Sequence, residues 1–250
     1  MNIVADYHTH TIYSHGKGTV MDNVMEARKK GLKRIAIADH GFGHFGFGIK
    51  VKDLPRIREE IDEINRRFDD IEVLFGIEAN LTGVNGEIDI PDELFGAFDI
   101  ILMGFHKAVI PSTVRDGWNL FFKNAIDSIN PLKGNHIRNQ NTKAIIKAIE
   151  HYPINIITHP GAKIDIDSRL LARAAAERNV ALEINASHGF MTAEYVKIAM
   201  EEGASFVINS DAHIPQNVGV FDKGIRIAEE AGLPPERIIN TMVSYTGTKD

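Results

Sequence analysis

The sequence predicts an α/β protein built on a sheet of parallel strands. Short apolar runs rich in β-branched residues recur along the chain, and most of them are separated by segments with the apolar spacing of helices. Strands that alternate with helices form a parallel sheet, which is either closed as a barrel or open and doubly wound. The seven expected strands favour a barrel slightly short of the usual eight.

Each apolar run has the length and composition of a buried strand. In chain order the expected strands are residues 3–7, 34–38, 72–76, 99–104, 154–158, 180–185 and 205–209. The expected helices, which often end at Gly or Asn, are residues 20–30, 54–68, 142–151, 168–178 and 192–202.

The composition is that of an ordinary globular protein, with 44% apolar and 25% charged residues among 250. The net charge of −6 includes no long basic run, which argues against a nucleic-acid partner. There is no signal peptide and no apolar run of about 18 residues, so we expect a cytoplasmic protein without a membrane partner. Because the chain has no cysteine, any metal must be held by imidazole and oxygen.

We predict a single barrel domain over residues 1–250, although this length would also suit two smaller domains. Residues 109–141 break the alternation and are expected to form an inserted loop with a short helix. This segment contains Trp118, Phe121 and Phe122, which we interpret as anchors of a lid or of an interface in a homo-oligomer. Residues 82–93 indicate a structured turn region.

Histidines and carboxylates follow most of the expected strands. The pattern comprises His8 and His10 after the first strand, His40 after the second, Glu78 after the third, His106 after the fourth, His159 after the fifth, and Asp211 with His213 after the seventh. In a parallel barrel these strand ends share one rim, so the residues would converge there. One histidine after a strand is more often a hydrogen-bonded loop residue than a ligand. Six of the seven strands repeat the pattern, however, which favours a common site.

Imidazole and carboxylate groups are the ligand set of zinc, manganese and iron. Protonated histidines would repel one another in a shared site, and metal ions would remove that conflict. Glu78 could bridge two cations, and two ions roughly 3.5–4 Å apart form a clamp for in-line displacement at phosphorus. The pattern therefore indicates a hydrolase that attacks with a metal-bound hydroxide and needs no catalytic nucleophile from the protein.

The candidate ligands lie within six short motifs. These are Asp6-Tyr7-His8-Thr9-His10-Thr11, Ile37-Ala38-Asp39-His40-Gly41, Gly76-Ile77-Glu78-Ala79-Asn80, Gly104-Phe105-His106, Thr158-His159-Pro160-Gly161 and Ser210-Asp211-Ala212-His213. Together they span nearly the whole chain and resemble the PHP (polymerase and histidinol phosphatase) superfamily of metal-dependent phosphoesterases. Residues 76–89 and 182–187 are most similar to its YcdX-like phosphatases. The resemblance implies a distorted (β/α)7 TIM-like barrel with three divalent metal ions, Zn²⁺ first and Mn²⁺ or Fe²⁺ as alternatives.

The ligand positions of the family carry over to nine residues of this chain. The resemblance implies one ion held by His8, His10, Glu78 and Asp211, a second held by Glu78, His106 and His159, and a third held by His15, His40 and His213. Asp39 precedes a ligand and would point elsewhere, so we expect it to orient a neighbouring group and not to bind metal.

Further residues are candidates for contact with substrate. His44 lies in a glycine-rich loop and could act as general acid, although a solvated loop histidine is the simpler interpretation. Lys107, Arg138 and Lys163 could bind phosphate oxygens or be ordinary surface cations. His188 would face the active rim without an assigned role.

The leading hypothesis is hydrolysis of a small phosphomonoester at a trinuclear site, with the ions neutralising charge on the phosphoryl group. Phosphodiester cleavage in nucleic acid is one alternative, against which the lack of a basic patch counts. Amidohydrolases also use His-x-His on a barrel, but the pair Asp211 and His213 fits the phosphoesterase pattern better. The non-enzymatic alternative is a metal-binding scaffold.

Overall fold

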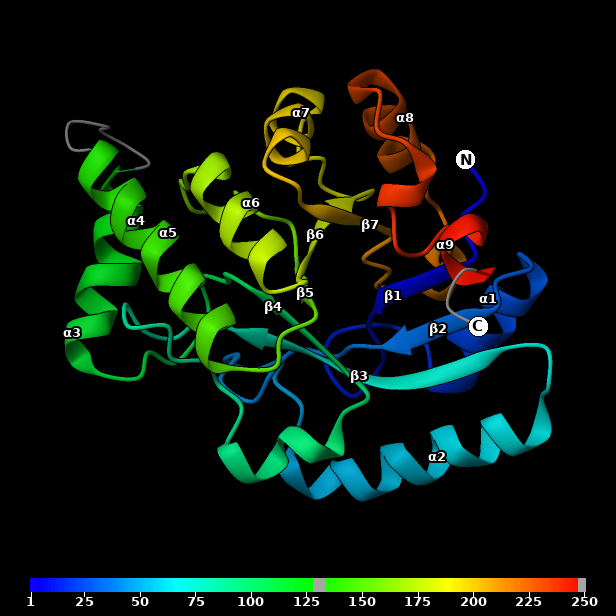
Figure 1. Cartoon of the computed structure of the whole chain (residues 1–250). Coiled ribbons are helices and arrows are strands. Elements are labelled where there is room, and N and C mark those ends of the chain that lie inside the picture. The colour runs from blue at the N-terminus through cyan, green and yellow to red at the C-terminus, as the bar shows by residue number, and fades with distance from the viewer. Residues whose placement is uncertain (128–133, 247–250) are drawn as a thin grey trace.

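A barrel of parallel strands forms the centre of the molecule (Figure 1). The computed structural model describes residues 1–127 and 134–246, and within them seven strands are hydrogen-bonded in chain order. The strands are β1 (Ala5–Thr9), β2 (Arg34–Ile37), β3 (Glu72–Asn80), β4 (Ile100–Gly104), β5 (Ile156–Ile157), β6 (Ala181–Asn185) and β7 (Ser205–Asn209). All neighbouring pairs are parallel.

The barrel is nearly closed, because β1 contacts the chain that leaves β7. The His10 N–H donates to the carbonyl of Ala212 at 2.8 Å, and the Ala212 N–H donates to the carbonyl of His8 at 3.3 Å. The Tyr7 N–H donates to the side-chain oxygen of Asn209 at 3.0 Å. The predicted seven-stranded α/β barrel is confirmed.

The barrel is distorted at β3, which changes partner along its length. Residues 72–75 pair with β2, and residues 76–80 pair with β4. Gly76 lies at this change, where an added Cβ would be 3.1 Å from Cγ2 of Ile100 and 3.2 Å from the carbonyl oxygen of Ile37. The close approach of three strands therefore requires glycine at this position.

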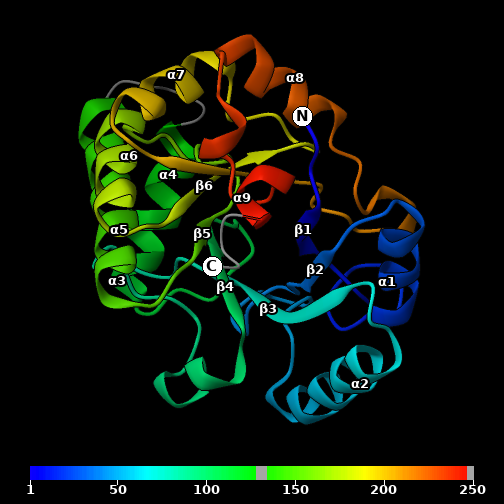
Figure 2. The same cartoon turned by 45° about the vertical axis from the view of Figure 1, so that its right-hand side comes forward.

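Helices cover the outside of the barrel (Figure 2). The longer ones are α1 (Val20–Lys29), α2 (Leu54–Arg67), α5 (Gly134–His151), α6 (Ser168–Glu177), α7 (Ala193–Glu201) and α8 (Asp222–Ala231). The shorter segments are α3 (Val114–Asp116), the π-helical η3 (Gly117–Phe122), α4 (Lys123–Asp127), α9 (Met242–Thr246) and the 3-10 turns η1 (Val51–Asp53), η2 (Asp92–Ala97), η4 (Pro215–Asn217) and η5 (Pro235–Arg237). No helix within residues 1–127 and 134–246 is long and apolar enough to cross a membrane.

Several predicted boundaries were wrong, those of β3 and α5 by the most, and α8 was not predicted. Strand β3 continues to Asn80 because its second half finds a new partner in β4. Helix α5 begins at Gly134, so much of the expected inserted loop is helical. Helix α8 buries only the small residues Gly224, Ala228 and Ala231, while its larger apolar side chains, Ile225 and Ile227, are partly buried.

The described parts of the predicted insertion, residues 109–127 and 134–141, pack beside the barrel (Figure 1). The buried amides of Asn124 and Asn141 exchange hydrogen bonds of 2.8 and 2.9 Å, which join α4 to α5. Phe121 stacks on Phe105, which follows β4, with ring centres 5.4 Å apart. Trp118 is more than half exposed. Residues 128–133 of the predicted insertion lie outside the described residues.

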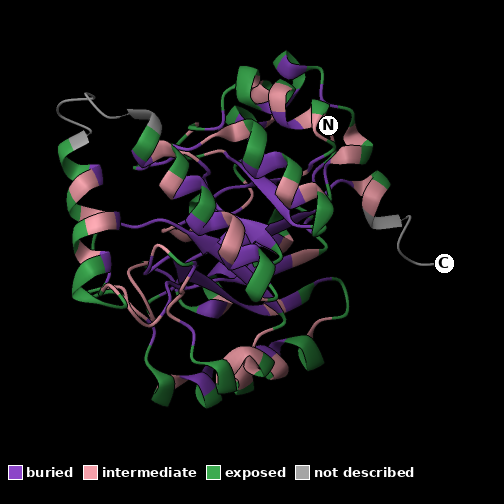
Figure 3. Cartoon of the chain, turned by 60° about the vertical axis from the view of Figure 1, so that its left-hand side comes forward, coloured by how far each residue is buried: buried purple, intermediate pink, exposed green. Residues whose placement is uncertain are grey.

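The interior of the barrel changes from apolar to polar along the strands. Figure 3 shows that buried residues concentrate in the strands and that exposed residues concentrate on the helices. A small apolar cluster that includes Ala5, Ala36, Leu102 and Val207 fills one part of the barrel, and a larger cluster lies between strands and helices. Beyond the small cluster, towards the carboxyl ends of the strands, the inward side chains are charged or polar.

Candidate metal centre

The predicted ligands meet at the carboxyl ends of the barrel strands. A cavity of about 460 Å³ lies there, lined by His15, His40, His44, Phe47, Glu78, His106, His159, Lys163, His188, Asp211 and His213. His8 and His10 are completely buried, and each has a ring nitrogen within 3.5 Å of Asp211. The structure therefore brings all nine predicted ligands into one cluster.

Glu78 occupies the centre of this cluster. Its Oε1 atom lies 3.3 Å from Nε2 of His8, 3.5 Å from Nε2 of His106 and 3.0 Å from Nε2 of His159, and its Oε2 atom lies 2.9 Å from Nδ1 of His40 and 3.7 Å from Nε2 of His10. The sequence analysis placed Glu78 after the third strand and His8 after the first, but Glu78 lies within β3 and His8 within β1. Glu78 shares one face of its strand with Gly76 and Asn80. One carboxylate thus contacts five imidazoles.

Three overlapping groups have the geometry to hold an ion, because their ligand atoms lie within 4.8 Å of one another. They are His8 with His10 and Asp211, His40 with Glu78 and His106, and His10 with His40 and His213. The first group contains three of the four ligands that the resemblance implied for one ion. In the other two, His40 takes the place expected of His159 and His10 takes the place expected of His15.

His15 and His159 nevertheless adjoin these groups. The ring of His15 stacks on His40 at 4.8 Å and lies 4.2 Å from the ring of His213. The ring of His159 lies 5.2 Å from that of His106. Both side chains can therefore complete an ion's ligand set.

The chemistry of the donor atoms fits divalent metal ions. Several buried nitrogen and oxygen atoms lack a hydrogen-bond partner, although other polar atoms lie near them. These atoms are Nε2 of His8, both ring nitrogens of His10, Nδ1 of His15, His40 and His44, and Oε2 of Glu78. A buried polar atom without a partner is destabilising, and ligation would supply the missing interaction. Imidazole and carboxylate donors suit zinc, manganese or iron.

Burial and charge set the protonation states that metal binding needs at Glu78, Asp211, His10 and His106. At His8, by contrast, burial is outweighed by the nearby carboxylates, which raise the pKa well above its usual value. Burial would raise the pKa of the Glu78 carboxyl, but the imidazoles around it, His106 first, hold it well below its usual range. The pKa of Asp211 is also held well below its usual range, against the effect of burial, by His8 and His10. Burial lowers the pKa of His10 and His106 well below the usual value. The carboxylates are therefore ionised and these two imidazoles neutral near pH 7.

Two of the clustered residues have strained backbones. His159 has φ of 31° and Asp211 has φ of 53°, which is the left-handed region that non-glycine residues rarely adopt. Such strain costs about 1–3 kcal/mol per residue and gathers at functional sites. Surrounding contacts hold the conformation, as when the His159 N–H donates to Oε2 of Glu183 at 2.7 Å.

A model of the PHP domain family matches residues 6–210, which is most of the chain. The chain belongs to the PHP domain family.

The relatives of this PHP protein carry matching descriptions. It is 34% identical over 256 residues to a probable phosphatase of Shewanella frigidimarina, an alignment that covers 96% of this chain and 90% of the relative. It is 33% identical over 250 residues to the probable phosphatase YcdX of Shigella dysenteriae, covering 94% and 89%. The predicted family is confirmed, and the PHP protein is a phosphatase, a hydrolase of phosphoric esters.

A solved structure shares the barrel of the PHP protein. It is that of histidinol phosphate phosphatase from Lactococcus lactis, complexed with zinc, L-histidinol and phosphate, and it matches with a TM-score of 0.64 at 17% identity. The match covers 92% of this chain and 94% of that one. The likeness shows a common fold.

Glu183 supports the centre of the PHP protein and was missed in the sequence. This completely buried residue of β6 accepts hydrogen bonds from Nδ1 of His8 at 2.7 Å, from Nδ2 of Asn209 at 2.9 Å and from Nδ2 of Asn185 at 3.0 Å. Its carboxylate binds Nδ1 of His8, so that Nε2 is the ring nitrogen that faces the cluster. The signal was a lone acid within the apolar strand 181–185, since a buried charge needs partners.

Asp89 and Asn80 hold His106 in the same manner. Nδ1 of His106 donates to Oδ1 of Asn80 at 2.7 Å, and the Asn80 side chain donates to Oδ2 of Asp89 at 2.5 Å. Asp89 also accepts from the Gly43 N–H at 2.7 Å, which joins the turn 82–93 to the glycine-rich loop. This arrangement leaves Nε2 of His106 facing Glu78.

The residues predicted beside the ligands have distinct positions. Asp39 accepts hydrogen bonds from the N–H and hydroxyl of Thr11 at 2.7 and 2.6 Å, so it orients the loop that follows β1. His44 is half-buried in the cavity wall, with its ring 4.6 Å from that of His40. Nε2 of His188 lies 3.1 Å from Oδ2 of Asp211.

Of the three candidate cations, Arg138 lies apart from Lys107 and Lys163. Lys163 lines the cavity of the ligands, whereas Lys107 lines two neighbouring cavities and not this one. Arg138 donates from Nε to the carbonyl of Ile166 at 3.1 Å, with Nη2 at 3.8 Å from Asp167, and it lines none of these three cavities. Helix α5 carries Arg138 to that loop and thus away from the cluster.

Proposed function

We propose that this PHP protein hydrolyses small phosphomonoesters at a centre of three divalent metal ions. The position of Glu78, with two oxygens among five imidazoles, supports the proposal most strongly. Nine candidate ligands exceed what one tetrahedral or octahedral ion requires. The three groups with ligand geometry overlap at His10 and His40, which is the arrangement expected of neighbouring ions.

The ions would activate water for attack on phosphorus and neutralise charge on the phosphoryl group. The protein prepares the ligands for this. Glu183 and Asn80 each accept a hydrogen bond from Nδ1 of a histidine, His8 and His106 respectively, which leaves the Nε2 atoms free to bind. The zinc bound in the related Lactococcus structure supports zinc as the first choice, with manganese or iron as alternatives.

The charge and size of the site favour a small monoester over nucleic acid. The cavity of about 460 Å³ suits a phosphoryl group with a modest leaving group. Lys163 is the one lysine or arginine among its lining residues, and the chain carries a net charge of −6. A groove that follows a polynucleotide backbone would need several cations.

The test compares p-nitrophenyl phosphate with bis(p-nitrophenyl) phosphate, using purified protein loaded with Zn²⁺ or Mn²⁺ and protein treated with chelator. We expect turnover of the monoester, at least about tenfold faster than the diester, and loss of turnover after chelation. Glu78→Gln should abolish turnover. Glu72→Gln, an exposed change in the same strand, is the matched control. Preference for the diester, or no turnover by the fully metal-loaded protein, would refute the proposal.

A further inference from the structure

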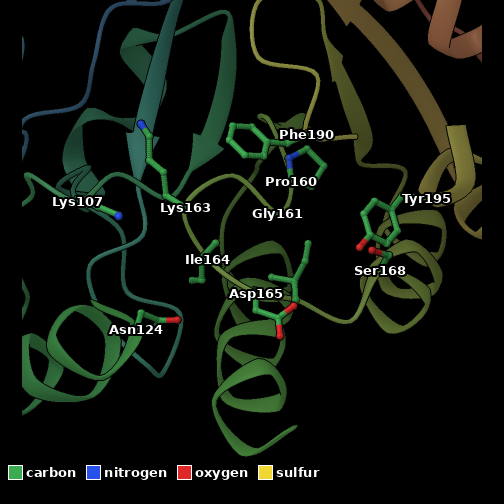
Figure 4. A pocket seen from close by; sticks show the side chains of 11 residues that line it. Lys107, Asn124, Pro160, Gly161, Lys163, Ile164, Asp165, Ser168, Phe190 and Tyr195 are labelled. Carbon is green, nitrogen blue, oxygen red and sulfur yellow. The ribbon is translucent and has the colours of Figure 1, made fainter. Parts of the chain in front are cut away.

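Two more cavities adjoin the proposed metal centre, and all three meet at Lys163. The first has about 500 Å³ and the second about 350 Å³. Lys107, Asn124 and Lys163 line both, and Lys163 also lines the cavity of the ligands. In Figure 4 both lysines lie on one side of the first cavity, with Tyr195 and Ser168 on the other. A substrate with its phosphate at the metal centre would extend its leaving group past Lys163.

Lys163 is held in place by its loop. It follows His159 in the turn after the short strand β5, and its own φ of 64° is in the left-handed region. Lys163 lines the cavity of the ligands together with His44 and His106, as well as both side cavities. The ammonium group therefore faces the junction between phosphate and leaving group.

Lys107 is placed further from the scissile phosphate. It directly follows His106, but it lines only the two side cavities. Within residues 1–127 and 134–246, neither Lys107 nor Lys163 has an ion pair with a carboxylate. Two lysine side chains thus line the space of the leaving group, and neither forms an ion pair with a described carboxylate.

The other walls of the side cavities provide little else that is charged. The second is lined by the aromatic rings of Phe105, Phe121 and Phe122. Among the residues that the structure describes, the second cavity has no carboxylate in its lining and Asp165 is the one acid in the first. Asn124 has no amide proton left for an anionic ligand, because its Nδ2 already donates to Leu120 and Asn141. The two ammonium groups are therefore the main charged groups that line the cavities beside the metal centre.

We propose that the leaving group of the substrate carries its own anionic group, a carboxylate or a second phosphate, which Lys107 binds. Lys163 lies between this group and the scissile phosphate and interacts with both. A neutral leaving group would leave the charge of Lys107 without a partner in the complex. The inference rests on the proposed phosphomonoesterase function and defines its substrate class.

The kinetic test uses three monoesters: β-glycerophosphate with a neutral leaving group, 3-phosphoglycerate with a carboxylate, and fructose 1,6-bisphosphate with a second phosphate. In Lys107→Ala we expect kcat/KM to fall about tenfold for whichever anionic substrates the wild type prefers, mainly through KM, and to stay within about twofold for β-glycerophosphate. Lys163→Ala should lower kcat/KM for all three. Lys33→Ala removes the same charge before β2, at the opposite end of the barrel, and should change none.

A binding experiment separates this inference from the proposed chemistry. Calorimetry on the metal-loaded protein compares 3-phosphonopropionate with propylphosphonate, which differ by one carboxylate and cannot be hydrolysed as esters. We expect the wild type to bind the carboxylate compound at least about fivefold more tightly, and Lys107→Ala to lose that difference. Equal affinities, together with no kinetic preference for either anionic ester, would overturn the inference even if β-glycerophosphate is hydrolysed. Absence of all hydrolysis would instead overturn the proposed function.

Discussion

Glu183→Gln is the most informative single substitution, because it keeps the size of the side chain while it removes one acceptor oxygen and the negative charge beside His8. The wild-type carboxylate accepts at Oε1 from His8 and Asn209, and at Oε2 from the His159 N–H and Asn185. The amide of glutamine has only one oxygen. Two of these four donors would therefore face an NH₂ group.

The structure gives the size of the effect. Each buried donor that loses its acceptor costs about 1–3 kcal/mol, so the pair costs about 2–6 kcal/mol. For a chain of this size, at about 2–4 °C per kcal/mol, the melting temperature should fall by roughly 4–24 °C. If the NH₂ group faces His8, Nδ1 must accept and the proton moves to Nε2, the atom that lies 3.3 Å from Glu78. A loss of metal affinity of about 10–100-fold follows.

The assay has two parts. Calorimetric melting of chelated protein measures the loss of stability, and competition with a chromophoric chelator measures zinc affinity. Glu72→Gln is the control, since Glu72 is half exposed and its ion pair with Arg34 contributes about 1 kcal/mol or less. If Glu183→Gln melts and binds zinc like the wild type, Glu183 does not orient His8 and the reasoning is refuted.

Three further outcomes are expected. Glu78→Gln should lose more bound metal than His15→Ala, because Glu78 lies among five imidazoles while His15 stands at the edge of the cluster; equal losses in elemental analysis would argue against a bridging carboxylate. Gly104→Ala should reduce metal content, since its Cβ would come within 2.9 Å of Cε1 of His159, whereas Gly96→Ala has open space; similar metal content in both would contradict the packing argument. Chelated protein should lose stability as pH falls from 6.5 to about 4. Burial beside other imidazoles lowers the pKa of His15 to about 4, so the unfolded chain takes up the proton first. His15→Ala should flatten the dependence of melting temperature on pH, and an unchanged slope would count against a neutral His15.

The fold followed from periodicity where strands and helices have strong apolar patterns. The helix α2 buries Leu54, Ile57, Ile61 and Ile64 at helical spacing, and such a pattern is legible in sequence. Helix α8 buries only small residues, and it was not predicted from the sequence. The extent of β3 depends on pairing with β4, a tertiary contact that no local window contains.

The candidate site followed from the rule that parallel strands share a rim, which requires no knowledge of side-chain contacts. The groups that orient the ligands could not be found in that way. Asp89 reaches His106 only through Asn80, and nothing in its turn marks it. Arg138 is the opposite case, a residue that the sequence analysis proposed for the site and that lies elsewhere. It belongs to α5 and donates a hydrogen bond to the carbonyl of Ile166.

The metal content of the protein tests the central proposal most directly. Purified protein is saturated with Zn²⁺ or Mn²⁺, freed of excess ions and measured by elemental analysis against protein concentration. The proposed centre predicts a stoichiometry that approaches three ions per chain, falling in Glu78→Gln and unchanged in Glu72→Gln. A saturating value of one ion or none would contradict a multinuclear centre, and a firm plateau at two would contradict the third ion assigned to His15, His40 and His213.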